Sequence, residues 1–172
     1  VPRSSEEILY LNANSSWCKL VSSTDIDKID LINNPTIKKL NLSGTKLAEQ
    51  FVLFNGTANE QGLSSRAGID LTGNLSGDNK AYGIGGTDFG IRPMMGIQSV
   101  SVTHENRGSL RQASVKIKAW NKTQFEIIDV LYLRLGFSVL LEWGNSMYFD
   151  NNYVLQTKVN NSLADEFLNG NL

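Results

Sequence analysis

The alternation of hydrophobic and polar side chains is most regular between residues 97 and 145. Two runs in this region, 97–104 and 113–120, alternate with the period of two that a β-strand imposes. A short polar stretch centred on Gly108 separates the runs, so the pattern predicts an antiparallel hairpin with one solvated face. The residues expected to share a face are Val100, Val102 and His104 in the first run and Ala113, Val115, Ile117 and Ala119 in the second.

Residues 121–136 change to the spacing of an amphipathic helix. Asn121 is expected to cap the first turn through its side-chain oxygen, and Gln124 to reach back in the manner of a capping box. Gly136 stands where a left-handed C-cap is expected. The predicted buried stripe consists of Phe125, Ile128, Leu131 and Leu135, broadened by Ile127 and Tyr132.

A strand is predicted directly after the helix, at residues 137–143, and Gly144 with Asn145 ends it. Trp143 alternates with Glu142 as a core residue would. We therefore expect the helix to pack against a sheet made by the strands around it. One face of the predicted strand holds Phe137, Val139, Leu141 and Trp143, and the other holds Ser138, Leu140 and Glu142.

The first half of the chain gives weaker signals. Residues 1–20 fit either a short helix or a first strand. The apolar run 51–54 leads into Asn55-Gly56 and predicts a buried strand that ends in a tight turn. Residues 55–96 are crowded with Gly, Asn and Ser and predict a long loop or a pair of short hairpins. Long loops often bind or assemble.

The C-terminal part, about 153–168, is expected to add a strand at 153–159 and a short helix at 162–168 that Asn161 or Ser162 caps. Together the patterns predict one domain over residues 1–172, with its regular core at about 97–145. The predicted fold class is α+β and mostly β, a small antiparallel β-barrel or sandwich with one helix packed on it. Because the sequence begins with Val1 and not with Met, we expect it to be part of a longer chain or a processed form.

The composition is low in charge for a chain of 172 residues. Charged residues make up 19%, below the roughly 25% of ordinary globular proteins, and the net charge is −1. The chain has no excess of basic residues of the kind that binds a nucleic-acid backbone. No apolar run reaches the roughly 20 residues that span a bilayer. The single cysteine, Cys18, excludes a disulfide within the chain and is interpreted as a buried, inert thiol.

The residues that carry chemistry in enzymes are scarce. His104 is the only histidine, and no nucleophile motif accompanies it. The carboxylates of residues 25–30 begin like a calcium loop, but Asp30 stands where that loop needs glycine. The glycine-rich run 82–86 lacks the lysine of a phosphate-binding loop. We therefore expect no enzymatic activity, no catalytic residue, no metal site and no cofactor.

One stretch suggests a contact surface. The pair Arg92-Pro93 favours an extended backbone, and two adjacent methionines, Met94 and Met95, then point to opposite sides of it. Methionine adapts to irregular partner surfaces, although filling of the core is its more common role. Arg92, Met94, Met95 and Trp120, which lies on the lysine side of its strand, are the candidate assembly residues.

The order of a strand, a hairpin, a capped helix and then "LGFSVLLEWG" resembles the tail-tube-type domain of baseplate hub proteins in contractile phage tails and of type VI spike-hub proteins. The resemblance covers mainly residues 91–145. Glycines and branched residues of the family's last strand correspond to Gly136, Val139, Leu141 and Gly144.

The resemblance implies a structural component of a phage virion. Such domains pair strand edges around a ring that continues the tail tube, with other copies and neighbouring virion proteins as partners. DNA passes through the ring without specific binding, and no membrane is involved. The protein would reside in the phage tail, after assembly in the host cytoplasm.

A second reading is a secreted or cell-surface β-rich module that binds carbohydrate or acts as an adhesin. The Asn-x-Ser/Thr triplets and the three tryptophans, Trp17, Trp120 and Trp143, fit it. Aromatic placement separates the two readings, because a sugar platform needs exposed aromatic rings. The sequence predicts that Trp143 is buried and that Trp120 is the better platform candidate.

Overall fold

The computed structural model describes residues 2–28, 35, 38, 46–56, 95–157 and 163–172. Most of the predicted loop at 55–96 lies outside these residues, as do Arg92 and Met94. In chain order the described elements are α1 (Ser5–Ala13), β1 (Ser16–Ser22), η1 (Ile26–Lys28), α3 (Lys46–Gln50), β2 (Leu53–Asn55), β3 (Gly96–Glu105), η4 (Asn106–Gly108), β4 (Leu110–Lys118), α4 (Lys122–Tyr132), β5 (Val139–Asn145), β6 (Tyr148–Phe149), β7 (Leu155–Gln156) and α5 (Ala164–Leu168).

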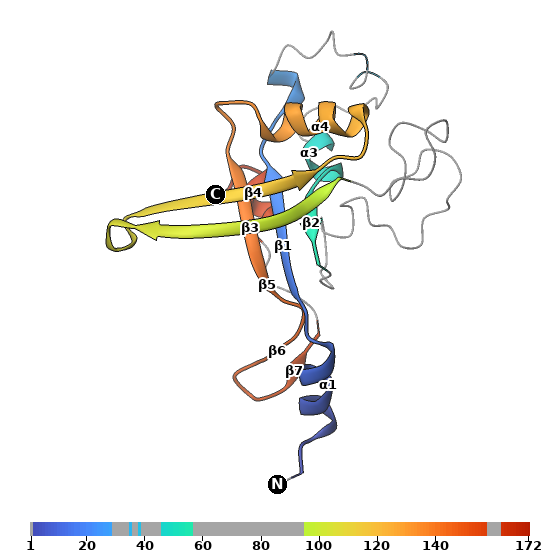
Figure 1. The fold of residues 1–172 in the computed structure, drawn as a ribbon, viewed down its shortest axis with the longest axis vertical. Helices are drawn as coiled ribbons and strands as arrows, with labels where there is room; N and C mark the ends of the chain where they lie inside the picture. The colour runs from blue at the N-terminus through green and yellow to red at the C-terminus, as the bar shows by residue number, and fades with distance from the viewer. Residues whose placement is uncertain (1, 29–34, 36–37, 39–45, 57–94, 158–162) are drawn as a thin grey trace, which may run out of the picture.

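The strands form three antiparallel sheets (Figure 1). The central sheet has the order β2-β1-β5, and the pairs β3-β4 and β6-β7 form two hairpins. The predicted α+β class with antiparallel strands is confirmed. None of these sheets closes into a barrel within the described residues, so the barrel of the prediction is not seen there.

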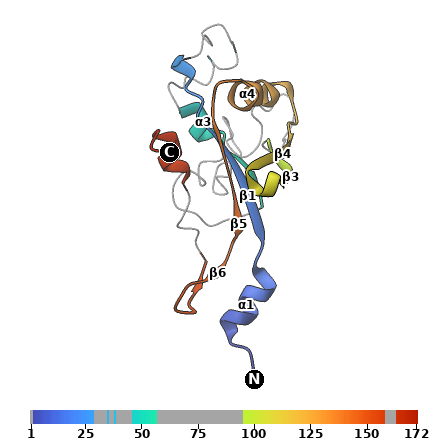
Figure 2. The same ribbon diagram turned by 90° about the vertical axis from the view of Figure 1, so that its left-hand side faces the viewer.

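The central sheet is covered on both faces. On one face Leu20 and Leu53 join a core with Met95, Ile97 and the inner side of α4. On the other face Val21 and Val52 pack against Ala164 of α5, with Phe167 beside them. Figure 2 shows α5 and the β3-β4 hairpin on opposite sides of β1 and β5. The apolar alternation of β1 therefore supplies both cores, one from each side of the strand.

Helix α4 begins where the sequence predicts. The Asn121 side chain accepts a hydrogen bond from the backbone N–H of Gln124, with 2.8 Å between oxygen and nitrogen. The Gln124 side chain reaches back and accepts from the N–H of Trp120 at 2.9 Å, while the residue itself is fully buried. These two bonds satisfy donors at the start of the helix and fix its first turn.

The predicted buried stripe of α4 is partly wrong. Ile128 and Leu131 are buried as expected, but Phe125 is 54% exposed and Leu135, beyond the helix end, is 98% exposed. The buried side follows positions 124, 127, 128 and 131, which is the i, i+3, i+4, i+7 spacing set from one residue earlier. The polar Gln124 occupies the inward position because its amide is needed at the cap.

The helix end also differs from the prediction. Gly136 has the expected positive φ, 92°, but it lies in a turn three residues after Leu133, which is the C-cap residue. The carbonyl of Leu131 is instead satisfied by side chains, because the buried hydroxyls of Ser22 and Thr24 donate to it. Tyr132 places its hydroxyl 3.0 Å from the carbonyl oxygen of Leu20, which ties the helix to β1. Burial raises the pKa of Tyr132.

The strands on either side of α4 lie in different sheets, contrary to the expectation of a common sheet. β4 pairs with β3, whereas β5 pairs with β1 along its whole length, from Val139 opposite Ser22 to Asn145 opposite Ser16. The chain therefore crosses from the hairpin over the core to the central sheet. The same register sets Gly144 against the ring of Trp17, where an added Cβ would lie 3.2 Å from a ring carbon.

The two terminal segments differ from the prediction in the elements that they form. Residues 1–20 contain both of the predicted alternatives, the helix α1 followed by the strand β1. Of the strand expected at 153–159, the described residues 153–157 form only β7, which pairs with β6. Helix α5 begins at Ala164 with Leu163 at its N-cap position, and the cap candidates Asn161 and Ser162 lie outside the described residues.

Candidate functional site: strand edges and exposed aromatic side chains

Strand β5 presents an open edge. It pairs with β1 on one side, and no other strand of the described residues pairs with it. The N–H of Ser146 donates to the carbonyl of Ser15, and the N–H of Ser23 donates to the carbonyl of Ser138. An antiparallel ladder alternates, so the N–H groups of residues 140, 142 and 144 face β1 and those of 139, 141, 143 and 145 face outward. Four outward donors in a row can pair with another strand.

Two apolar side chains beside this edge are exposed. Val139 is exposed at the start of β5, and Trp143 is 62% exposed near its end. The predicted burial of Trp143 is wrong. Trp143 does share a face with Leu141, which packs against the core, but it lies opposite Cys18 where that core ends. Val139 and Trp143, which the sequence predicts as structural residues, are thus both exposed beside the strand edge.

The hairpin β3-β4, residues 96–118, leaves the body and is called the arm below (Figure 1). Its first residues belong to the core through Ile97, while Val100 and Val115 pack partly against it. Every residue from 103 to 114 is exposed. The arm is therefore a two-stranded ribbon that is solvated on both faces over its outer half, and its outer backbone edges are open on both sides within the described structure.

The turn at the tip of the arm is formed by residues with left-handed backbone. Asn106, Arg107 and Gly108 have φ values of 50°, 58° and 88°. Positive φ is uncommon at residues other than glycine. This turn joins the two strands in the register that sets Val100 opposite Val115 and Val102 opposite Ala113.

Of the four candidate assembly residues from the sequence, the structure describes Met95 and Trp120. Met95 is buried in the main core at 5% exposure, so its role is core filling and it offers no surface in this structure. Trp120 is 42% exposed, and the Lys118 ammonium lies 5.0 Å from its ring centroid. Arg92 and Met94 cannot be placed, since they lie outside the described residues.

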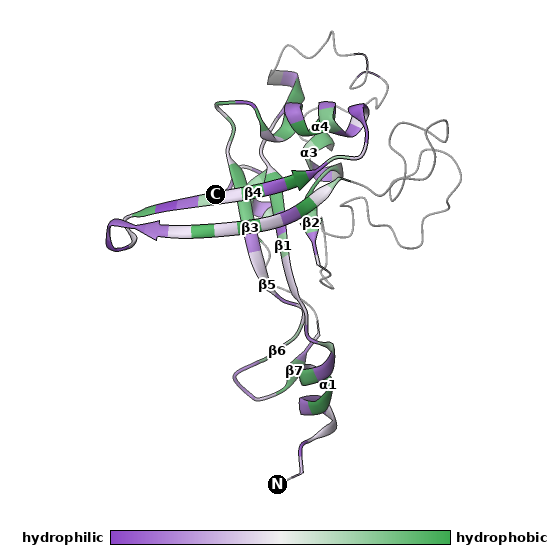
Figure 3. Cartoon of the chain, viewed as in Figure 1, coloured by the Kyte–Doolittle hydropathy of each residue, from purple (hydrophilic) through white to green (hydrophobic). Residues whose placement is uncertain are grey.

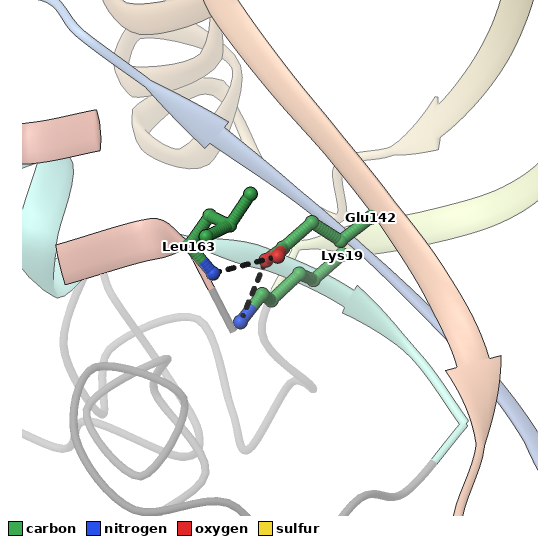
Figure 4. A network of polar contacts seen from close by, with 3 residues as sticks. All are labelled: Lys19, Glu142 and Leu163. Carbon is green, nitrogen blue, oxygen red and sulfur yellow. Dashed lines mark hydrogen bonds and ion pairs between the residues drawn. The ribbon is translucent and has the colours of Figure 1, made fainter. Parts of the chain in front are cut away.

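A buried ion pair lies on the other face of the central sheet (Figure 4). The Lys19 ammonium is 3.0 Å from Oε2 of Glu142, and the Lys19 side chain is 1% exposed. Oε1 of Glu142 accepts a hydrogen bond from the N–H of Leu163 at 2.9 Å, which holds the start of α5 against the sheet. The ammonium also lies 5.7 Å from the ring centroid of Trp17. These contacts hold β1, β5 and the start of α5 together.

Sequence reasoning missed this pair. The alternation of residues 137–143 presents Glu142 only as a polar neighbour of Trp143, and no sequence motif singles out Lys19. The signal was present in the alternation of residues 17–21, where Lys19 stands between Trp17 and Val21 on the face that becomes buried. Pairing of Lys19 with Glu142 follows only once β1 and β5 are known to be neighbours in this register.

His104 and Cys18, both weighed for catalysis, lie on different strands, β3 and β1. His104 lies in the exposed part of the arm. Cys18 is partly buried, and burial raises the pKa of its thiol, which disfavours the reactive thiolate. Among the described residues no three His, Cys, Asp or Glu side chains gather as a metal site would require. None of the described helices combines the length and the apolar character needed to cross a membrane.

Comparisons with protein-family models, with curated proteins and with solved structures found no match to this chain.

Proposed function

We propose that this chain is a non-enzymatic structural subunit that assembles through its sheet edges, and that it serves as a tail or baseplate hub component of a phage virion. The observation that carries the assembly is the open edge of β5, a seven-residue strand with outward N–H groups and the exposed Val139 and Trp143 beside it. Unpaired edges invite pairing with another chain, and natural monomers usually cover or charge them.

The open sheets fit a ring of subunits. Neither the central sheet nor the arm closes on itself in the described residues, so further strands can be added at their edges. In a closed ring each subunit satisfies the edge of the next, and no edge is left for uncontrolled growth. The virion context comes from the resemblance of residues 91–145 to tail-tube-type hub domains. With it comes the proposed location in the phage tail, after assembly in the host cytoplasm.

The test uses the direction of the N–H groups in β5. Val139→Pro removes an N–H that faces outward and leaves the bonds to β1 in place, at the first residue of a strand where proline is tolerated. Trp143→Lys places a charge on the same edge. We expect both variants to fold and to lose the oligomer of the full-length protein in native mass spectrometry. The matched control is Phe125→Lys, which changes a similarly exposed aromatic residue on α4 and should assemble normally.

Electron micrographs of the wild-type oligomer give the second readout. Rings, or the protein located within a tail, support the hub. A wild-type chain that stays monomeric alone and with its virion neighbours would contradict assembly through β5.

The exposure of Trp143 and Trp120 favours a second candidate, a carbohydrate-binding or adhesin module. Exposed aromatic rings are what a sugar platform needs, and the sequence had predicted Trp143 to be buried. A glycan array with the wild type and with Trp143→Ala and Trp120→Ala separates the candidates. Binding that either variant abolishes, by a monomeric wild type, would favour the module over the hub.

A further inference from the structure

The lower end of the molecule in Figure 1 forms a second projection, which we call the foot: helix α1 with the β6-β7 hairpin, residues 2–14 and 147–157. The ring of Tyr10 in α1 lies 5.2 Å from that of Phe149 in β6. The Asn14 side chain accepts a hydrogen bond from the N–H of Met147. The two parts of the foot are thus joined to each other.

Helix α1 is well capped but covered by little. Ser4 and Glu7 form a reciprocal capping box, yet none of the nine helical residues is buried. Ile8, Leu9 and Leu11 are all exposed, and Figure 3 shows apolar and polar residues mixed around the helix. Isolated helices shorter than about 12–15 residues are marginal in water. A helix of this length with its apolar side chains in solvent is suited to packing against another protein surface.

The loop of the foot holds one aromatic side chain outward. Asp150 Oδ1 accepts hydrogen bonds from the N–H groups of Asn152 at 2.8 Å and Val154 at 3.0 Å, and Oδ2 accepts from the Gln156 amide at 2.9 Å. The N–H of Val154 is the main reason that the pKa of Asp150 is lowered. Between these anchors Tyr153 has a φ of 59° and is 85% exposed. Strained residues persist where their surroundings hold them and are concentrated at functional sites.

The arm and the foot carry opposite charge. The described residues of the foot hold three carboxylates, on Glu6, Glu7 and Asp150, against one cation, Arg3. The arm holds one carboxylate, Glu105, against four cations: Arg107, Arg111, Lys116 and Lys118. Both also expose apolar side chains: the foot exposes those of α1 given above, and the arm exposes Leu110 near its tip, which is half exposed. The arm and the foot point away from the body in different directions, as Figure 1 shows.

We infer that the arm of one copy of this chain binds the foot of the next copy. The basic ribbon would lie along the acidic end of α1, and its exposed Leu110 would meet the apolar side chains beside Tyr153. Because the two surfaces differ, the contact is heterologous: it closes a ring if the rotation between copies allows it, and otherwise extends a stack. The inference rests on the proposed self-assembly and adds to it a contact that does not use the edge of β5.

Charge reversal tests the contact. Arg111→Glu and Glu6→Lys each reverse an exposed charge that forms no side-chain bond or ion pair to another described residue. We expect each variant alone to self-associate roughly fivefold or more weakly in analytical ultracentrifugation of the full chain. A mixture of the two variants should recover association. In the mixture the arm that carries Arg111→Glu meets the foot that carries Glu6→Lys, which restores an opposite pair of charges at that contact. The unchanged arm of the second variant meets the unchanged foot of the first.

Controls make the same charge changes elsewhere. The control variants are Asp129→Lys, within α4, and Arg134→Glu, just after it. Both residues are exposed and lie outside the arm and the foot. These variants should behave as the wild type, alone and mixed.

The outcomes separate this contact from the edge of β5. If association is lost in Val139→Pro but is unchanged in both charge variants, the arm–foot contact is wrong and the edge-paired assembly stands. If the charge variants lose association and their mixture does not recover it, the contact is also wrong. If association stays at wild-type strength while Arg111→Glu loses binding to duplex DNA, the arm serves a nucleic acid instead. A wild-type chain that is monomeric at every concentration, both alone and with its virion neighbours, contradicts both proposals.

Discussion

The central sheet and the two projections are built from similar strands and helices, but they differ in what surrounds them. β1 is buried along most of its length, with a core on each face. The outer half of the arm and all of α1 have no buried residue. The sheet is therefore stabilised within one chain, whereas the arm and the foot contribute little to the fold that holds them. The proposed contact between copies would give the arm and the foot the cover that they lack within one chain.

The largest effect on folding is expected at the buried ion pair. Glu142→Leu removes the carboxylate that Lys19 contacts and leaves a charge inside the second core, which should lower the free energy of unfolding by roughly 3–5 kcal/mol. It also removes the acceptor of the Leu163 N–H and so weakens the hold on α5. Denaturant titration measures the loss.

The double variant Lys19→Met/Glu142→Leu is the control. An apolar pair of similar size should recover much of the stability, because no charge remains to be desolvated. A loss of less than about 1 kcal/mol in the single variant would mean that water reaches Lys19 and that this face of the sheet is not a sealed core.

A matched pair of leucines sharpens the contrast between core and surface. Leu131→Ala removes a side chain that is 1% exposed and should cost roughly 2–5 kcal/mol, through lost burial and the cavity left behind. Leu135→Ala makes the same change four residues later in full solvent and should stay within about 0.5 kcal/mol of the wild type. Equal midpoints for the two variants in denaturant titration would show that α4 presents another face to the core.

The same two leucines show what the sequence could and could not predict. Periodicity gave the hairpin, the cap at Asn121 and the helix itself, since these depend on neighbours within a few residues. Periodicity also placed Phe125 and Leu135 in the core, and both are exposed. Phe125 lies on a side of α4 that faces solvent, and Leu135 lies beyond the end of the helix, but spacing along the sequence shows neither fact. Local pattern fixes an element, but its inward face is chosen by packing.

Pairing between distant strands was beyond the pattern. β5 finds its partner more than 100 residues earlier in the chain, and this pairing alone decides that Glu142 meets Lys19 and that Trp143 passes the end of the core. Two further features depend on the same pairing information. Met95 looked adaptable and is buried in this structure, and the open edge that β5 has among the described residues is a property of the sheet and of no single residue. An edge can be recognised only when the strand order is known.

The smallest effect on folding is expected on the arm. Leu110→Ser changes a half-exposed residue that faces Glu105 across the ribbon and joins neither core, so the free energy of unfolding should change by no more than about 0.5 kcal/mol. If the arm is a contact between copies, the same substitution should weaken self-association, because it removes apolar surface that the partner covers. Denaturant titration and sedimentation of one preparation measure the two effects together. A loss of stability as large as that of Leu131→Ala would mean that the arm belongs to the folding core after all, and the division between a self-sufficient sheet and outward-facing projections would be wrong.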